Sequence, residues 1–522
     1  MPPSGFRATI QEHARVREVA LRVAQARFRT SLYSLALAFH GYTLPIAALS
    51  CNHSRQYMLT DRTRIPLIQL AWPIFVENLL RTSLMSVDTF MLSRYSQKAV
   101  AAMSLVNQFA FFIQLLYMMM AIGASILISQ NLGAGNRRQA GLLGVGSLTL
   151  VVGLSVVLSV AVALAAGPVL SLYDLDPDVA RYGRQFLTIY GGLSVFMAFN
   201  IGQASILRAW GYARGPMFVN ITALVLTVTG NALCLFGPFG FPVLGVVGVA
   251  SSTVASQVVA CGMYAVIIRR RKEIELPFSR LASIPRSVYR TVLAVGVPTA
   301  GENLSYNVSQ IVILSMVARM GTEALATYGI LIAVLRYVFM PGISIGSAGQ
   351  IKVGYFVGAG RPEESQGRVY RYFAIGFLTS LALVLAINAF KRPILGVFSS
   401  SDSLVGLAAA VLLVAIAHEP GRNFNTIINP ALKGAGDVRF PVIVGIIGMW
   451  CVGTFGAWLL GVHLKLGLVG VWIAMAADEW SRGIVMLIRW RSGAWKEKAF
   501  VQLDDETVVA AALSGVEQSE GV

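Results

Sequence analysis

Charged residues are scarce in this chain. Only 13% of its 522 residues are charged, whereas 56% are hydrophobic. Soluble proteins carry roughly 25% charged residues, and a soluble chain of this length could not bury so much apolar surface. The composition therefore excludes an ordinary soluble protein and predicts a membrane protein.

Residues and motifs that carry enzymatic chemistry are also lacking. The four cysteines, Cys51, Cys234, Cys261 and Cys451, form no C-x-x-C pair, and three of them fall in apolar segments, where they are expected to pack as small side chains. The five histidines are scattered, and no G-x-x-x-x-G-K-[ST] loop occurs. We therefore expect that the protein has no metal site and no cofactor, does not use ATP directly and is not an enzyme.

Long apolar segments fill most of the chain. Each is about 20 residues or longer, which suffices to cross a hydrocarbon core of about 30 Å as a helix. The sequence predicts an all-α polytopic membrane protein with twelve transmembrane helices. They lie near 65–93, 99–130, 140–168, 182–207, 216–237, 245–268, 291–318, 324–355, 367–390, 404–431, 441–462 and 467–489.

The net charge of +17 does not indicate nucleic acid, because the basic residues gather in short loops. The loops that follow the even-numbered segments hold most of them, including Arg137, Arg138 and the run at 269–272. Loops rich in Lys and Arg face the cytoplasm. We expect a multi-pass protein of the cell (inner) membrane with both termini in the cytoplasm.

The chain repeats itself with an offset of 225 residues. Pro73-x-x-x-Glu77-Asn78-Leu79 recurs as Pro298-x-x-x-Glu302-Asn303-Leu304 (298 − 73 = 225). Gly-Ala-Gly at 133–135 recurs at 358–360, and Leu, Gly, Arg and Pro at 207, 211, 214 and 216 recur at 432, 436, 439 and 441. A duplicated set of apolar helices is typical of a secondary transporter whose substrate site lies between the copies.

Each copy would cross the membrane six times, an even number, so both copies start on the same side. The sequence thus predicts two pseudo-symmetric six-helix bundles as parallel repeats, 64–268 and 291–490, joined by a cytoplasmic linker, 269–290, interpreted as a solvated loop. The extension 1–63 lies outside the repeat. It is interpreted as a segment upstream of a translation start at Met58, an amphipathic surface helix or a disordered arm. The tail 491–522 is expected to lie in the cytoplasm, and its acidic part beyond Phe500 is expected to be disordered.

Three ionisable residues fall in the first segment. A charge at membrane depth costs about 2.5–3.5 kcal/mol on insertion scales and is a functional hypothesis by default. Glu77 and Arg81 are four residues apart on one helical face, a spacing at which they could pair. Asp88 has only leucines at its i ± 4 positions. Apolar surroundings favour the protonated form of such a carboxyl group, which suits it to carry a proton; the alternative is a hydrated, inert residue at the outer mouth.

The second copy carries its charges differently. Glu302 repeats Glu77, but Ile313 stands at the position of Asp88 (88 + 225 = 313). The remaining candidates for substrate binding, or for an ion network that holds the second bundle together, are Glu419, Arg422, Asp478 and Arg482. Pro73 and Pro298 interrupt the first helix of each bundle and are candidates for a gating bend or a static kink.

These motifs, in order and repeated, resemble the multidrug and toxic compound extrusion family over roughly 64–490. The resemblance rests on Pro73 followed by Asp88, on Gln130 to Gly135, on Leu207 to Met217, and on Leu432 to Asp437 before Phe440-Pro441. It implies a pair of bundles that exports organic cations or other amphipathic compounds in exchange for Na⁺ or H⁺. The expected partners are the lipid bilayer and such small compounds, not nucleic acid, and a monomer is expected.

The resemblance also implies a coupling site. The family's coupling acid of the first helix falls on Asp88, its fifth-helix Asn on Asn231 and its sixth-helix Thr on Thr253, whereas Leu235 replaces a second acid. One carboxylate, one amide and one hydroxyl form a poor cage for Na⁺, which favours H⁺. In the second half, Asn307 and Arg422 stand where some members have acids.

Two other functions stay open. A flippase for a lipid-linked precursor shares the two-bundle plan, commonly with fourteen spans and a cationic cavity, which Arg81, Arg336 and Arg422 could line. A polytopic membrane enzyme would need clustered catalytic groups. The one Asp-Asp pair, at 504–505, lies in the polar tail instead.

Overall fold

The computed structural model describes residues 61–171, 173, 175–237, 242–399 and 401–501, and within these ranges every regular element is a helix. The interpretations of the extension and of the acidic tail fall on residues 1–60 and 502–522, which lie outside the described residues. The first half comprises α3 (Leu67–Tyr95), α4 (Gln97–Gly133), α5 (Arg137–Leu170), α6 (Pro177–Phe186), α7 (Val195–Ala209), α8 (Arg214–Phe236) and α9 (Gly245–Arg270). The second half comprises α10 (Arg286–Ala318), α11 (Thr322–Gly358), α12 (Pro362–Ala389), α13 (Lys391–Gly396), α14 (Asp402–Asn423), α15 (Asn429–Ala435), α16 (Arg439–Gly448), a π-helical stretch to His463 and α17 (Gly467–Ser492).

These helices account for the twelve predicted spans. Among the described residues, eight helical segments are long and apolar enough to cross a membrane by themselves, and α6 with α7 forms a ninth that is bent by 47°. The other three, α3, α10 and α17, are long enough but carry more polar side chains. The count among the described residues is therefore 8 + 1 + 3 = 12. Each of the three more polar helices supplies charged groups to the central cavity described below.

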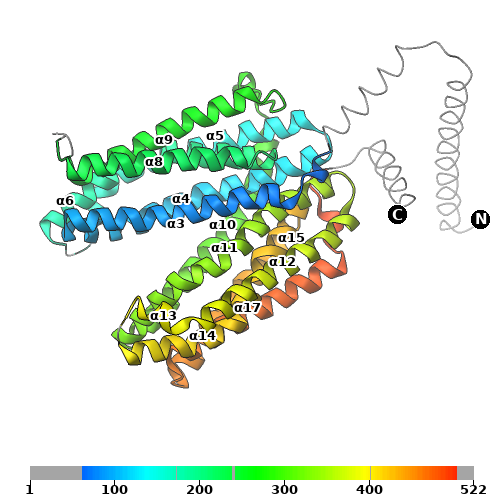
Figure 1. Cartoon of the computed structure of the whole chain (residues 1–522). Helices are drawn as coiled ribbons and strands as arrows, with labels where there is room; N and C mark the ends of the chain where they lie inside the picture. Colours follow the sequence, from blue (N-terminus) through cyan, green and yellow to red (C-terminus); the bar gives the residue numbers. More distant parts are fainter. Residues whose placement is uncertain (1–60, 172, 174, 238–241, 400, 502–522) are drawn as a thin grey trace, which may run out of the picture. The chain divides into compact units, whose positions relative to one another are not determined.

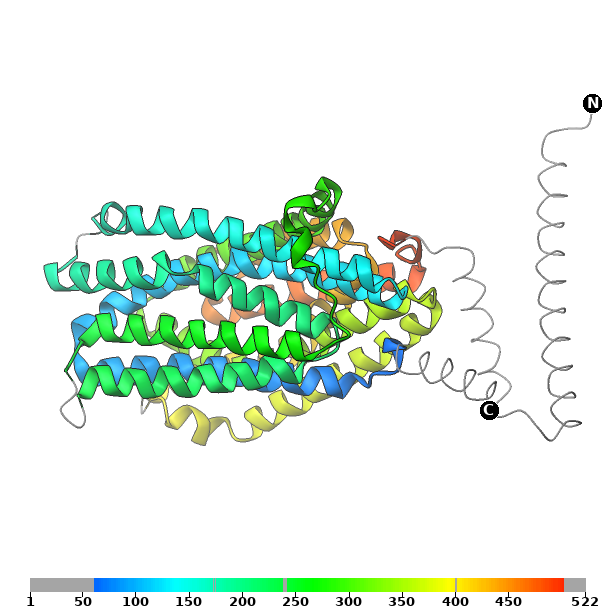
Figure 2. The same cartoon turned by 90° about the horizontal axis from the view of Figure 1, so that it is seen from above.

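The halves pack along two helices that the repeat relates. Residues 97–133 of α4 and 322–358 of α11 differ by 225 at both ends (97 + 225 = 322; 133 + 225 = 358). In each half these long helices lie at the centre, since α4 packs on α10 and α11, and α11 packs on α3 and α4. In Figure 1 the helices of the two halves diverge towards the end where α6 and α13 lie, and Figure 2, seen from above, shows them running along a common direction. The described residues from Arg62 onwards belong to one compact unit.

Glycine turns end the equivalent helices of both halves in the same way. The Gly-Ala-Gly loops close α4 and α11 with Gly135 (φ 76°) and Gly360 (φ 69°), a left-handed backbone that glycine adopts without strain. Gly211 (φ 86°) and Gly436 (φ 107°) do the same after α7 and α15. The repeated glycines thus mark repeated helix ends, which is why they stand out in the sequence.

The two halves meet at one end of the molecule through equivalent contacts. The amide of Gln130 donates to the carbonyl oxygen of Gly434 at 2.8 Å, and the hydroxyl of Tyr355 donates to that of Ala209 at 2.5 Å. Donors and acceptors are each 225 apart (130 + 225 = 355; 209 + 225 = 434). A pseudo-two-fold axis therefore runs between α4 and α11, as expected for parallel repeats.

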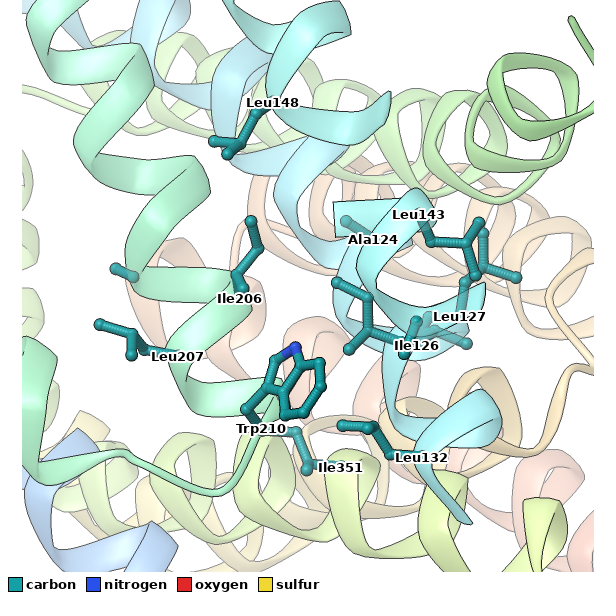
Figure 3. Close-up of a cluster of buried hydrophobic side chains, with 14 of the residues drawn as sticks. Ala124, Ile126, Leu127, Leu132, Leu143, Leu148, Ile206, Leu207, Trp210 and Ile351 are labelled. Atoms are coloured by element: carbon teal, nitrogen blue, oxygen red, sulfur yellow. The ribbon is translucent and has the colours of Figure 1, made fainter. Parts of the chain in front are cut away.

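An apolar core seals the same end. Figure 3 shows its side chains from α4, α5, α7 and α11, together with Trp210 at the end of α7, which is fully buried and lies near Leu132 and Ile351. Arg137 and Arg138 at the start of α5 and Arg361 just before α12 lie at this end, so it is the end that the positive-inside rule assigns to the cytoplasm. The structure is thus closed at its expected cytoplasmic end.

The linker between the halves is not simply a solvated loop, which corrects that interpretation. Ile274 and Ile284 are buried against the first half. The carboxylate of Glu273 accepts hydrogen bonds from Arg62 at 3.1 Å and from the hydroxyl of Tyr212 at 2.9 Å. The linker therefore helps to hold the closed end together.

Glycine is required where α4 and α11 cross. A Cβ atom on Gly358 would overlap the backbone carbonyl group of Gln130, and one on Gly133 would overlap that of Tyr355. We expect Gly358→Leu to force the two halves apart at their closed end, because backbone cannot move aside as a side chain can. In a chain without native cysteines, Leu132→Cys should then react readily with a membrane-impermeant maleimide.

The matched control for this substitution is Gly262→Leu in α9, where no atom lies within 4 Å of an added Cβ. It should leave the reaction of Leu132→Cys as slow as in the parent protein. Unchanged labelling in Gly358→Leu would contradict the claim that close backbone approach closes this end.

Candidate functional site

A cavity of about 820 Å³ lies between the two halves. Its walls come from α3, α4, α7, α8 and α9 of the first half and from α10, α11, α14, α15 and α17 of the second. This volume lies within the range of about 300–1,000 Å³ that is usual for small-molecule sites. Seven of the candidate residues line it: Glu77, Arg81, Asp88, Thr253, Glu302, Arg422 and Arg482.

Asp88 faces this cavity from α3 and is held by α8. The amide nitrogen of Asn231 donates to its carboxylate at 2.9 Å, and the amide oxygen of Asn231 accepts a hydrogen bond from Ser252 of α9. Thr253 lines the cavity, but its hydroxyl donates to the backbone carbonyl of Val249 at 2.8 Å. Asn231 therefore turns a donor, not an oxygen, towards Asp88.

The predicted pair of Glu77 with Arg81 is wrong. Glu77 instead accepts from Arg208 of α7, with both carboxylate oxygens 3.1 Å from one guanidinium nitrogen. Arg81 is exposed to the cavity and makes no ion pair or hydrogen bond with the described residues. The spacing i, i+4 places Glu77 and Arg81 on one helical face. The basic residue that pairs with Glu77, however, comes from another helix.

The second half repeats this ion pair. Lys433 of α15 binds the carboxylate of Glu302 at 2.5 Å, and Asn429 donates to its other oxygen at 2.8 Å. Both members match those of the first half (77 + 225 = 302; 208 + 225 = 433). Each half thus ties its first helix to its fourth span by one acid and one base.

Sequence reasoning missed Arg208 and Lys433, because the expected segments end at 207 and 431 and leave both residues just beyond them, in loops. Both lie within helices and line the cavity. The signal that could have found them is the repeat itself, because the same offset relates the two acids and the two bases. A basic side chain is tolerated at membrane depth at these two positions, because each has an acidic partner and faces a polar cavity.

Asp478 and Arg482 form a buried ion pair within α17. The guanidinium group donates to both carboxylate oxygens of Asp478, at 2.7 and 2.6 Å, and lies 3.4 Å from Glu479. Asn425 donates to Glu479 at 2.7 Å. Arg482 and Glu479 line the cavity, whereas Asp478 lies behind them.

Arg422 of α14 extends this network to the cavity wall. It lies 3.5 Å from Glu419 and 3.8 Å from Glu479, and donates to the hydroxyl of Tyr306 at 3.2 Å. Its guanidinium group also stacks over the ring of Phe339, 4.3 Å from the centroid. Glu419 is fully buried and lies 3.0 Å from His418. Arg422 is therefore balanced by two acids.

Three further candidates lie outside the cavity wall. Asn231 is buried behind Asp88, and Pro73 and Pro298 lie inside α3 and α10, which run as unbroken helices through them. A role of the two prolines in gating stays a prediction.

The family model described as MatE matches residues 73–233 and again 298–459. The two matches begin 225 residues apart (298 − 73), at the paired prolines, so the model finds the same repeat as the sequence motifs. Together the two matches cover more than half of the chain.

Individual proteins agree with this match. The uncharacterized transporter YisQ of Bacillus subtilis (strain 168) is 36% identical over 440 residues, which cover 84% of this chain and 96% of that protein. A probable multidrug resistance protein NorM of Thermotoga maritima is 29% identical over 440 residues, 84% and 94% of the two chains.

Solved structures share the fold. An outward-facing multidrug resistance MATE family transporter of the MOP superfamily superposes with a TM-score of 0.77 at 20% identity, over 84% of this chain and 99% of that one. A MOP superfamily transporter from Pyrococcus furiosus, described as having a binding pocket of reverse polarity, superposes with a TM-score of 0.75 at 20% identity, over 83% and 96%.

Proposed function

Because this chain belongs to the MatE family of membrane transporters, we propose that it exports organic cations or other amphipathic compounds in exchange for protons. It is a transporter and not an enzyme. Relatives named as probable multidrug resistance proteins support the class of substrate. A gradient, rather than ATP, would supply the energy, in a monomer of the cell (inner) membrane with cytoplasmic termini.

The observation that carries the proposal is that, among the described residues, the cavity has one carboxylate without a basic partner. Every other acidic residue that lines the cavity has a basic partner, whereas Asp88 has only the amide of Asn231. A carboxylate without a counter-charge attracts either a cationic substrate or a proton, and these two compete. Competition for one group is a direct means of coupling the entry of a proton to the release of a substrate.

Protons suit this site better than sodium ions. Na⁺ needs several oxygen ligands, but Asn231 points its N–H at Asp88 and Thr253 uses its hydroxyl hydrogen on the backbone. Protonation of Asp88 needs no further ligand. In the proposed cycle, the cavity releases substrate outward as Asp88 takes up a proton, and a second conformation, open to the cytoplasm, releases the proton and loads substrate.

The coupling ion is tested by efflux of a cationic dye from proteoliposomes that hold the purified chain. We expect an imposed proton gradient to drive dye movement and a sodium gradient of equal size to have no effect. A sodium gradient that drives the dye at constant pH would contradict proton coupling. Failure of both gradients would contradict the antiporter proposal.

A flippase for a lipid-linked precursor is the second candidate, because two of its three expected arginines, Arg81 and Arg422, line the cavity. Arg336 does not line it, and the part of the chain that the structure describes holds twelve spans rather than fourteen. Dithionite quenching of a fluorescent phospholipid in the same proteoliposomes separates the two. Protein-dependent loss of the protected inner-leaflet signal would favour the flippase.

A further inference from the structure

The basic residues of the cavity are not equivalent. Five of them line it: Arg81, Arg208, Arg422, Lys433 and Arg482. Four have an acidic partner within 4 Å, as described above. Among the described residues that line the cavity, only Arg81 presents a cation with no acid beside it.

Arg81 and Asp88 together form a pair of unsatisfied opposite charges. They stand seven residues apart on α3, two helical turns and roughly 10 Å along the axis, on nearly the same face. Both line the cavity, and each is accessible from it. Neither satisfies the other, since no ion pair joins them.

We propose that the compounds which this chain binds best carry an oxyanion group, a carboxylate or a phosphate, that pairs with Arg81 while their cationic part lies towards Asp88. The guanidinium group is planar, permanently charged and shaped to bind such groups through two parallel hydrogen bonds. The preferred substrates are thus amphoteric compounds rather than simple cations. This inference deepens the proposed function and rests on it for transport, but binding can be measured without it.

A pair of dyes that differ in one group tests the inference. Rhodamine 110 carries a free carboxylate on a cationic ring system, and rhodamine 123 is its methyl ester and lacks that charge. We expect the purified chain in nanodiscs of zwitterionic lipid to bind rhodamine 110 more tightly, as measured by fluorescence anisotropy. Arg81→Gln should weaken the binding of rhodamine 110 about five- to tenfold and should change the affinity for rhodamine 123 little.

Two variants serve as controls. Arg81→Lys keeps the charge and should retain most of the preference, whereas Arg336→Gln removes an arginine of α11 that does not line the cavity and should change neither affinity. Equal losses for both dyes in Arg81→Gln, or no preference for rhodamine 110 in the parent chain, would overturn the inference.

Lipid headgroups could supply the same oxyanion chemistry, and the test distinguishes them. If anionic lipid added to the nanodiscs abolishes the Arg81-dependent difference, a headgroup occupies Arg81 and the assignment to a soluble amphoteric compound is overturned. Failure of gradient-driven efflux with intact dye selectivity in binding would instead overturn the proposed antiport and leave the role of Arg81 standing.

Discussion

Efflux driven by a proton gradient is expected to vanish when Asp88 is replaced by asparagine, while the protein still folds and inserts. In the parent protein the amide nitrogen of Asn231 donates to the carboxylate of Asp88 at 2.9 Å. Asparagine at this position keeps the shape of the side chain and can still accept that hydrogen bond. It cannot bind or release a proton, so it fixes the site in a neutral state. Dye efflux from proteoliposomes should fall to the level of protein-free vesicles.

Binding should reveal the same change without transport. In the parent chain, affinity for a cationic dye should fall as pH falls, because protonation of Asp88 removes the negative charge that attracts the dye. In Asp88→Asn the affinity should be low and independent of pH. Glu323→Gln is a matched control, because it removes an exposed carboxylate at the first turn of α11 without touching the cavity. Efflux at the parent rate in Asp88→Asn would refute the mechanism.

The repeat made most of the fold predictable from sequence. Hydropathy located all twelve spans, and the offset of 225 related the two halves, because a duplicated bundle must repeat the residues that end and cross its helices. The glycines at 133 and 358 illustrate this, since each packs against backbone of the other half. Helices that approach one another this closely admit only glycine at the contact, so the contact can be recognised in the sequence.

The partners of the charged residues could not be predicted in the same way. A rule based on i, i+4 spacing considers only one helix, and it paired Glu77 with Arg81. The partner that Glu77 has in the structure, Arg208, stands 131 residues away on α7 and depends on how the spans pack. Hydropathy also misled, because it treats a charge near the end of an apolar segment as the start of a loop.

The ion pair between Glu302 and Lys433 should matter more for stability than its equivalent in the first half. The side chains of Glu302 and Lys433 are 10% and 8% exposed, whereas Arg208 beside Glu77 is 23% exposed. Removing one member of a buried pair leaves the other charge uncompensated and costs about 3–5 kcal/mol. We expect Glu302→Leu to lower the midpoint of thermal unfolding in detergent strongly, and Glu77→Leu to lower it less, since water in the cavity can hydrate Arg208.

The double variant Glu302→Leu/Lys433→Met distinguishes the effect of an uncompensated buried charge from the effect of losing the Glu302 side chain. It removes both charges and leaves apolar groups of similar length, which is often neutral for a buried pair. It should therefore recover most of the stability lost in Glu302→Leu. The asymmetry follows from the surroundings rather than from the pair, because the repeat supplies an acid and a base at equivalent positions in both halves and only their burial differs. Equal losses in Glu302→Leu and Glu77→Leu, or no recovery in the double variant, would show that the buried charge of Lys433 is not what makes Glu302 necessary.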